Sequence, residues 1–209
     1  DRRGTHASKW DMMAKLSGST AADGIPMWVA DMDFAAPPGV TAALTEVVNR
    51  AVHGYYADTG SWAIALAEWM ARRHGLTIDP GWVSPTPGVV SGLGLILQAV
   101  TEPGDEVVVF PPAYHAFRKI ILANDRRILD AQLSLQQGRY AMDLDALATK
   151  LTPRTKIVFF CSPHNPGGAV WSVEEIRALA TFCAERNLIL VSDEIHCDLV
   201  LGANKHTPT

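Results

Sequence analysis

The sequence lacks the features that mark nucleic-acid-binding, membrane-spanning and secreted proteins. It contains no basic run, and its net charge of −4 with a pI near 6.0 makes nucleic acid and anionic membranes poor candidate partners. No apolar run approaches the roughly 20 residues that a spanning helix requires. The opening residues, DRRGTHASKWD, have no apolar stretch of the kind found in signal peptides.

Cysteine is scarce, and its spacing is not that of a metal site. The three cysteines are Cys161, Cys183 and Cys197. An odd number in a chain of this size indicates reduced thiols and a cytoplasmic protein. A zinc site at His196 and Cys197 would need two more converging ligands, so we expect no bound metal.

The 209 residues alternate between helical and strand patterns, without repeats or low-complexity linkers. Helices are expected at 40–52, 62–74, 89–100, 114–123, 144–150 and 173–186, and strands at GDEVVVF, RRILD, KIVFFC and LILVS. This alternation predicts an α/β fold, a three-layer sandwich with a mostly parallel sheet covered on both faces. Within 62–74, we expect Ile64, Leu66, Trp69 and Met70 to face inward, and LILVS to be buried on both faces. Residues 1–35 are irregular and form an N-terminal arm.

Side chains capable of chemistry follow three of the predicted strands. GDEVVVF is followed by PPAYHAF, KIVFFC by SPHNPGG, and LILVS by DEIHCD. Because the carboxyl ends of parallel strands share one edge of a sheet, Tyr114, Asn165, Asp193 and His196 should converge there. A buried carboxylate such as that of Asp193 needs a cationic or hydrogen-bonding partner.

The stretch SPTPGVVSGLG adds an anion site to this edge. It reads as a turn that opens into a helix, in which Gly88 allows close approach and Val89 and Val90 offer backbone N–H groups. It matches neither the dinucleotide-binding nor the P-loop pattern. The alternative is a glycine-rich helix that simply packs tightly on the sheet.

Together these features describe a ligand with a phosphate, a flat ring, a polar ring substituent and a protonated ring nitrogen. Pyridoxal 5′-phosphate has all four, and Asp193 would pair with its pyridinium. Structural alternatives stay open: Tyr114 as a helix-start aromatic, Asn165 in an Asx turn, and His196 as a packing histidine. Glu194 is interpreted as a structural carboxylate.

The chain resembles the fold-type I pyridoxal-phosphate enzymes of the class I/II aminotransferase superfamily, and more narrowly the MalY/PatB-type cystathionine β-lyases, or C–S lyases. The resemblance rests on PMWVADMDF, HGYYADTGSW, PGVVSG, PGDEVVVFPPAYHAF, CSPHNPGG and VSDEIHCDLVLG, which span nearly the whole chain. It implies that residues 36–209 belong to the cofactor-binding large domain. Residues 1–35 would form the arm and part of the small domain.

The resemblance also implies roles for individual residues. Val89 and Val90 would bind the phosphate, Tyr114 would stack on the ring, Asn165 and His196 would face the ring oxygen, and Asp193 would hold the ring nitrogen. Tyr55 would reach the phosphate of the neighbouring subunit in a homodimer, and Ala30 and Asp31 would border the substrate. Many relatives carry Thr where this chain has Gly167, and we expect that loop to tolerate the difference. The family's Schiff-base lysine is expected beyond Thr209, because no lysine here, including Lys205, lies in a matching motif.

Three hypotheses for function follow from the resemblance. The first is a carbon–sulfur β-lyase that converts cystathionine-type amino acids into a thiol, pyruvate and ammonia. The second is an aminotransferase, which would share every cofactor-binding residue. The third is a catalytically silent, cofactor-binding regulatory protein.

Overall fold

The computed structural model describes residues 2–209 and divides the chain into two compact units, Asp1–Ala57 and Asp58–Thr209. The predicted boundary at residues 35/36 falls within the first unit, and the assignment of residues 36–57 to the larger domain stays a prediction. Among the described residues, no helix combines the length and the apolar character needed to cross a membrane. All three cysteines carry free thiols.

The first unit has little core. The prediction of an irregular N-terminal arm was wrong in part, because the arm contains two helices, of 4 and 5 residues, that are too short to show a helical repeat. The unit contains α1 (Ser8–Asp11), α2 (Met13–Ser17) and α3 (Pro38–Asn49). Helix α3 begins with proline at its first position, where the missing N–H costs nothing. Asp33 ties the arm together, because it accepts hydrogen bonds from Lys9 Nζ at 2.7 Å and Trp10 Nε1 at 2.7 Å. These contacts, led by Lys9, lower the pKa of Asp33 to about 2.

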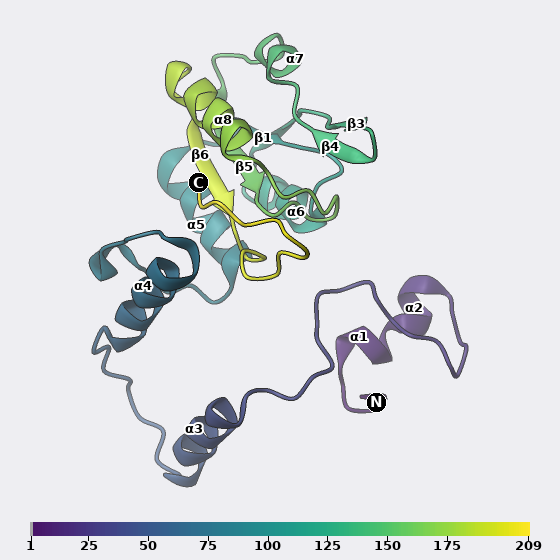
Figure 1. Cartoon of the computed structure of the whole chain (residues 1–209), viewed down its shortest axis with the longest axis vertical. Helices are drawn as coiled ribbons and strands as arrows, with labels where there is room; N and C mark the ends of the chain where they lie inside the picture. The colour runs from purple at the N-terminus through teal and green to yellow at the C-terminus, as the bar shows by residue number, and fades with distance from the viewer. Residues whose placement is uncertain (1) are drawn as a thin grey trace. The chain divides into compact units, whose positions relative to one another are not determined.

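The second unit is built on a parallel sheet, as predicted (Figure 1). Its strands are β1 (Glu106–Val109), β2 (Arg127–Asp130), β5 (Thr155–Cys161) and β6 (Ile189–Asp193), in the order β2-β1-β5-β6. Its helices are α4 (Ser61–His74), α5 (Val89–Val100), α6 (His115–Ala123), α7 (Leu144–Ala148) and α8 (Val173–Glu185), with a short 3₁₀ turn at Pro80–Trp82. A small antiparallel hairpin, β3 (Ser134–Gln136) and β4 (Arg139–Ala141), lies outside the main sheet.

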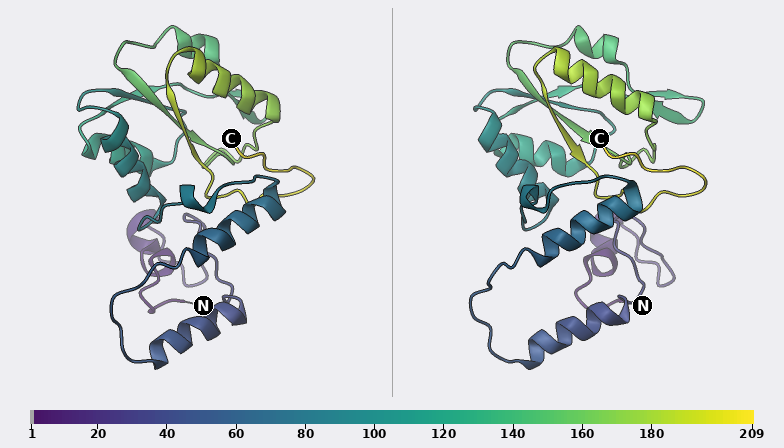
Figure 2. Two further views of the ribbon diagram at one scale, coloured as in Figure 1. Left: turned by 90° about the vertical axis from the view of Figure 1, so that its left-hand side faces the viewer. Right: turned by 60° about the vertical axis from the view of Figure 1, so that its left-hand side comes forward.

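Helices cover both faces of the sheet, which gives the predicted three layers (Figure 2). Successive residues of β1 and β5 point to opposite faces, as the pleat of a strand requires. One face packs on α8 through Val108, Val158, Phe160, Leu179 and Trp171. The other packs on α5 and α6 through Leu93, Leu97, Val107, Val109, Phe117, Ile121, Ile157 and Phe159. The central strands are therefore buried on both sides.

Two predictions about burial were wrong. LILVS forms β6, which pairs only with β5 among the described strands, and Ile189 is 41% exposed. In α4, Ala63 is the buried residue and Met70 is half-buried, while Ile64, Leu66 and Trp69 are exposed. Both errors have one cause: an apolar residue predicts burial only when a neighbouring element covers it, and the sequence pattern does not say which elements do.

Local signals explain why α8 begins where it does. Ser172 Oγ accepts the N–H of Glu175 at 3.2 Å, and the Glu175 carboxylate accepts the N–H of Ser172 at 2.8 Å. This reciprocal pair is a capping box, which satisfies two N–H groups of the first turn. Arg139 of the hairpin adds two bonds to the same carboxylate, at 2.7 and 2.6 Å, so the hairpin is fastened to the start of α8.

Candidate cofactor site

The segments predicted to carry the chemistry all follow the carboxyl ends of parallel strands. Tyr114 immediately precedes α6, Asn165 lies in the loop after β5, and Asp193 is the last residue of β6. Cys161 and Asp193 are register partners, and the N–H of Ser162 donates to the Asp193 carbonyl at 2.9 Å. The two strand ends therefore meet directly at this edge.

Asp193 is a buried acid that forms no ion pair among the described residues. The residue is 7% exposed, and its Oδ1 accepts the N–H of Ile195 at 3.1 Å. Burial raises the pKa of Asp193, while the Ile195 N–H and the nearby His196 act in the opposite direction. Desolvation thus outweighs the local hydrogen bond, and a positively charged ligand group placed here would favour the ionised form.

Asn165 is held through its backbone by a cysteine. The N–H of Asn165 donates to Cys161 Sγ at 3.3 Å, and the thiol donates to the Pro163 carbonyl at 3.3 Å. Burial raises the pKa of Cys161 to about 11, so the side chain is a neutral thiol and not a nucleophile. The sequence identified Cys161 only as one of three reduced thiols, because its contacts with the loop depend on the path of the chain after β5.

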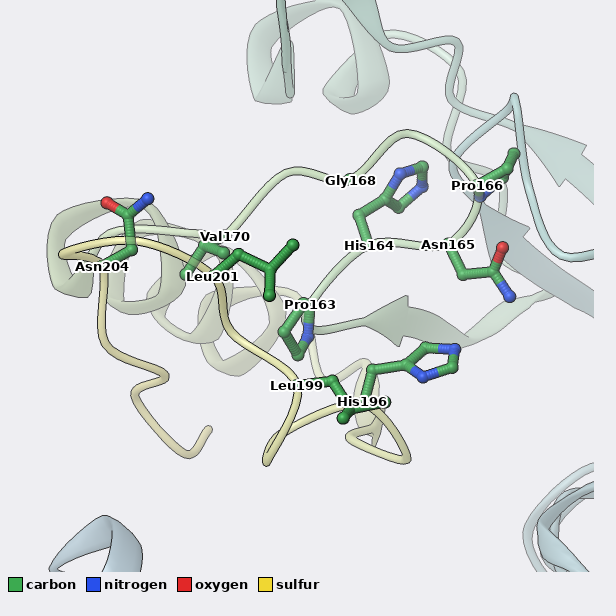
Figure 3. Close-up of a pocket in the computed structure, with 10 residues that line it drawn as sticks. All are labelled: Pro163, His164, Asn165, Pro166, Gly168, Val170, His196, Leu199, Leu201 and Asn204. Carbon is green, nitrogen blue, oxygen red and sulfur yellow. The ribbon is translucent and has the colours of Figure 1, made fainter. Parts of the chain in front are cut away.

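A pocket of about 500 Å³ opens between the loop after β5 and the segment after β6. Its lining residues are Pro163, His164, Asn165, Pro166, Gly168, Val170, His196, Leu199, Leu201 and Asn204. The Asn165 amide and the His196 ring extend in the same direction from the two loops (Figure 3). The volume lies in the range typical of small-molecule sites.

A smaller recess joins Asn165 to Tyr114. Both residues line it, together with Cys161, His164 and Phe117. The Tyr114 ring is half-buried and packs edge-on against Phe117, with centroids 5.9 Å apart. Asn165 therefore borders both cavities, whereas Asp193 lines neither and lies opposite Cys161 on the neighbouring strand.

The start of α5 has the properties expected of an anion site. Gly88 precedes the helix with φ of 93°, a conformation that glycine adopts readily, and no side chain of the described residues caps it. The first-turn N–H groups of Val89 and Val90 are thus available to an acceptor. Leu93, one turn later, belongs to the core cluster against which Tyr114 packs and which includes Cys161.

Three predicted site residues lie in the other unit. Tyr55 is fully exposed, and Ala30 and Asp31 lie in the irregular segment before α3. Asp31 Oδ1 accepts a hydrogen bond from Arg2 Nη1 at 2.8 Å. Their roles toward the phosphate and the substrate stay predictions.

The loop after β5 is less tolerant than we expected. A Cβ atom at Gly167 would lie 2.5 Å from Tyr140 Cδ2 and 2.6 Å from His164 Nδ1. The sequence did not reveal this constraint, because Tyr140 comes from the hairpin. Lys205 is exposed in a loop, consistent with the predicted surface turn.

Comparison with known proteins assigns the chain to a family. The family described as aminotransferase class I and II matches residues 27–209. The chain belongs to the aminotransferase class I and II family. Within it, the chain is 44% identical to cystathionine β-lyase PatB of Bacillus subtilis (strain 168), over 100% of its own length and 54% of that protein.

The chain is also similar to a second curated protein and to a solved structure. Protein MalY of Escherichia coli (strain K12) is 35% identical, over 100% of this chain and 53% of that protein. The crystal structure of cystalysin from Treponema denticola, which contains a pyridoxal 5′-phosphate cofactor, superposes with a TM-score of 0.92 at 32% identity, over 100% of this chain and 53% of the other. The chain spans about half the length of the family members that it matches.

Proposed function

We propose that this chain provides the pyridoxal 5′-phosphate-binding site of a carbon–sulfur β-lyase. The observation that carries the proposal is the buried acid Asp193, whose pKa is raised by burial and which forms no ion pair with any described residue. The donors nearby fit the cofactor: an uncapped helix start suits a phosphate, and a half-buried tyrosine suits a flat ring. The same group is named in the structure of cystalysin.

Each residue would contribute one interaction. Asp193 would hold the proton on the ring nitrogen, Asn165 and His196 would donate toward the ring oxygen, and Tyr114 would lie against the ring. The N–H groups of Val89 and Val90 would bind the phosphate. When bound, the cofactor supplies an electron sink for negative charge that develops on a substrate carbon.

The reaction and substrate are proposed from the family members. PatB is named a cystathionine β-lyase, so we expect a cystathionine-type amino acid to be cleaved to a thiol, pyruvate and ammonia. Ala30 and Asp31 would border this substrate. The lysine that links the cofactor is expected beyond Thr209.

We also propose a homodimer in which Tyr55 reaches the phosphate site of the neighbouring subunit. Tyr55 is fully exposed, and α3 exposes Val40, Leu44 and Val48. Exposed apolar surface of this kind is typical of subunit interfaces. A cytoplasmic location stays a prediction.

Release of pyruvate from cystathionine, with no added 2-oxo acid, tests the function. The experiment incubates the full-length enzyme and pyridoxal 5′-phosphate with cystathionine, and measures pyruvate and free thiol together. Equal amounts of both support the β-lyase. The family description favours an aminotransferase as the alternative; turnover only with an added oxo acid would establish it. Cofactor binding without either product would favour a silent regulatory protein.

A further inference from the structure

The turn that follows Asp193 is fastened at its beginning by Glu194. Glu194 Oε1 accepts the Ser192 hydroxyl at 2.9 Å and the N–H of Thr209 at 2.9 Å. Its Oε2 lies 2.9 Å from His206 Nε2. The acid next to the proposed ring-nitrogen partner is therefore bound to the segment 206–209, as expected of a structural carboxylate.

The same turn is fastened at its end by Asp198. Asp198 Oδ2 accepts Trp69 Nε1 at 2.9 Å, and Oδ1 lies 2.8 Å from His74 Nε2. Both partners belong to α4, which runs beside the segment after β6 (Figure 2). These contacts therefore join the C-terminal half of α4 to the segment after β6.

Contact between two imidazole rings joins the hydrogen bonds of Glu194 and those of Asp198 into one cluster. We call this cluster the anchor, and its residues are Trp69, His74, Glu194, Asp198 and His206. The rings of His74 and His206 meet edge to face, with centroids 5.4 Å apart. Their side chains are 7% and 2% exposed, whereas Ile195 in the turn above them is 61% exposed. Hydrogen bonds between carboxylates and buried imidazoles of this kind favour one arrangement of the chain.

A metal ion is a weaker explanation for the same cluster. Ligand atoms of His74, Cys197 and Asp198 lie within 4.8 Å of one another. Both Asp198 oxygens are already bonded within the anchor, however, and Arg73 Nε lies 3.6 Å from Oδ1. A guanidinium beside the carboxylate opposes a second cation.

We propose that the anchor is a positioning device, which holds the turn 193–198 so that Asp193 meets the cofactor ring nitrogen and His196 faces the pocket. The proposal rests on the proposed function. Within the turn, the N–H of Cys197 donates to the Glu194 carbonyl and that of Leu199 to the His196 carbonyl, both at 2.9 Å. Fastening both ends therefore fixes the atoms between them. The ionisable side chains that influence Asp193 are Glu194 and His196.

The test uses pyridoxamine 5′-phosphate, which has the ring nitrogen, ring oxygen and phosphate but no aldehyde. Its ultraviolet absorbance, followed against pH in the purified full-length protein, gives the midpoint at which the bound ring nitrogen loses its proton. A nearby carboxylate raises that midpoint. Asp198→Asn and His206→Gln should lower it by about one pH unit if Asp193 is no longer held in place. Glu185→Ala, which removes an exposed acid at the end of α8, should leave it unchanged.

Different outcomes separate the two proposals. If the anchor variants bind pyridoxamine 5′-phosphate with the midpoint of the unsubstituted protein, the positioning role is wrong, even when affinity or thermal stability has fallen. If the unsubstituted protein does not bind at all, the proposed function fails and the positioning role with it. Should both variants misfold, Trp69→Phe decides the question, since it removes a single N–H donor and keeps an aromatic ring.

Discussion

Asp193 places binding and stability in conflict at a single side chain. The residue is 7% exposed and its pKa is raised, mainly by burial. Without a cation, the folded protein must either keep the proton or carry a buried charge. A ligand with a pyridinium ring would pair with this carboxylate and offset the free-energy cost of its buried charge. Asp193 therefore stabilises the protein with the ligand bound more than the protein without it.

We therefore expect Asp193→Asn to stabilise the cofactor-free protein while it weakens cofactor binding. An acid whose pKa is raised on folding above its ordinary 3.8 destabilises the native state increasingly as pH rises through that window. At pH 7 the Tm of the variant should rise by about 2–4 °C for each kcal/mol gained in the free energy of unfolding. The gain should disappear below pH 3.8. Differential scanning calorimetry across pH checks this. A variant that is less stable than the parent at pH 7 would contradict it.

The positions of Asp193, Asn165 and Tyr114 at the sheet edge were predictable because each lies in a short motif that is local in sequence. Each residue follows a strand directly, and parallel strands bring such positions to one edge. The supporting residues were not predictable in this way. His74 and Asp198 are far apart in the chain, and His164, which is buried and accepts the Gly167 N–H at 3.2 Å, looked like one more residue of a loop.

At the scale of elements, the sequence predicted helices and strands best where the local signals agreed. Helix α5 was predicted with its observed bounds, because Gly88 opens it and the glycine-leucine pattern continues to Val100. The β3–β4 hairpin was missed. Its turn uses Gln137 with φ of 50° before Gly138, whereas the pattern that signals such hairpins has Asn or Asp at that position.

The hairpin also restricts the loop that carries Asn165. Gly167→Ala should destabilise the protein by about 1–3 kcal/mol, since its Cβ would overlap the Tyr140 ring and His164. Urea unfolding measures the loss. Gly39→Ala is the matched control: it adds the same methyl group within α3, where nothing lies within 4 Å, and should be neutral or stabilising.

Tyr140→Ala in the same chain tests the cause of that loss. If the overlap with the ring is responsible, the double variant should lose less stability than the sum of the two single variants. Additive losses, or a stable Gly167→Ala variant, would show instead that the loop moves freely to admit a side chain.

At the scale of the molecule, the three-layer fold followed from the alternation of strands and helices. The central strands agree with it, because their side chains pack into one hydrophobic cluster on each face of the sheet. What could not be predicted was coverage: which strand lies at an edge and which helical residues stay exposed. These depend on neighbours that the pattern of one segment does not specify. The role of Tyr55 depends on a subunit interface, and the roles of Ala30 and Asp31 depend on a bound substrate, so all three stay predictions.

The central claim is that the carboxyl edge of this sheet holds the cofactor. Calorimetric titration of the purified full-length protein with pyridoxamine 5′-phosphate tests it most directly, because this compound binds without the linking lysine. We expect one saturable site per chain and a loss of about tenfold or more in affinity for Asp193→Ala, the size expected when a charged hydrogen bond is removed. No saturable binding, or binding that is unchanged in Asp193→Ala, would contradict the claim.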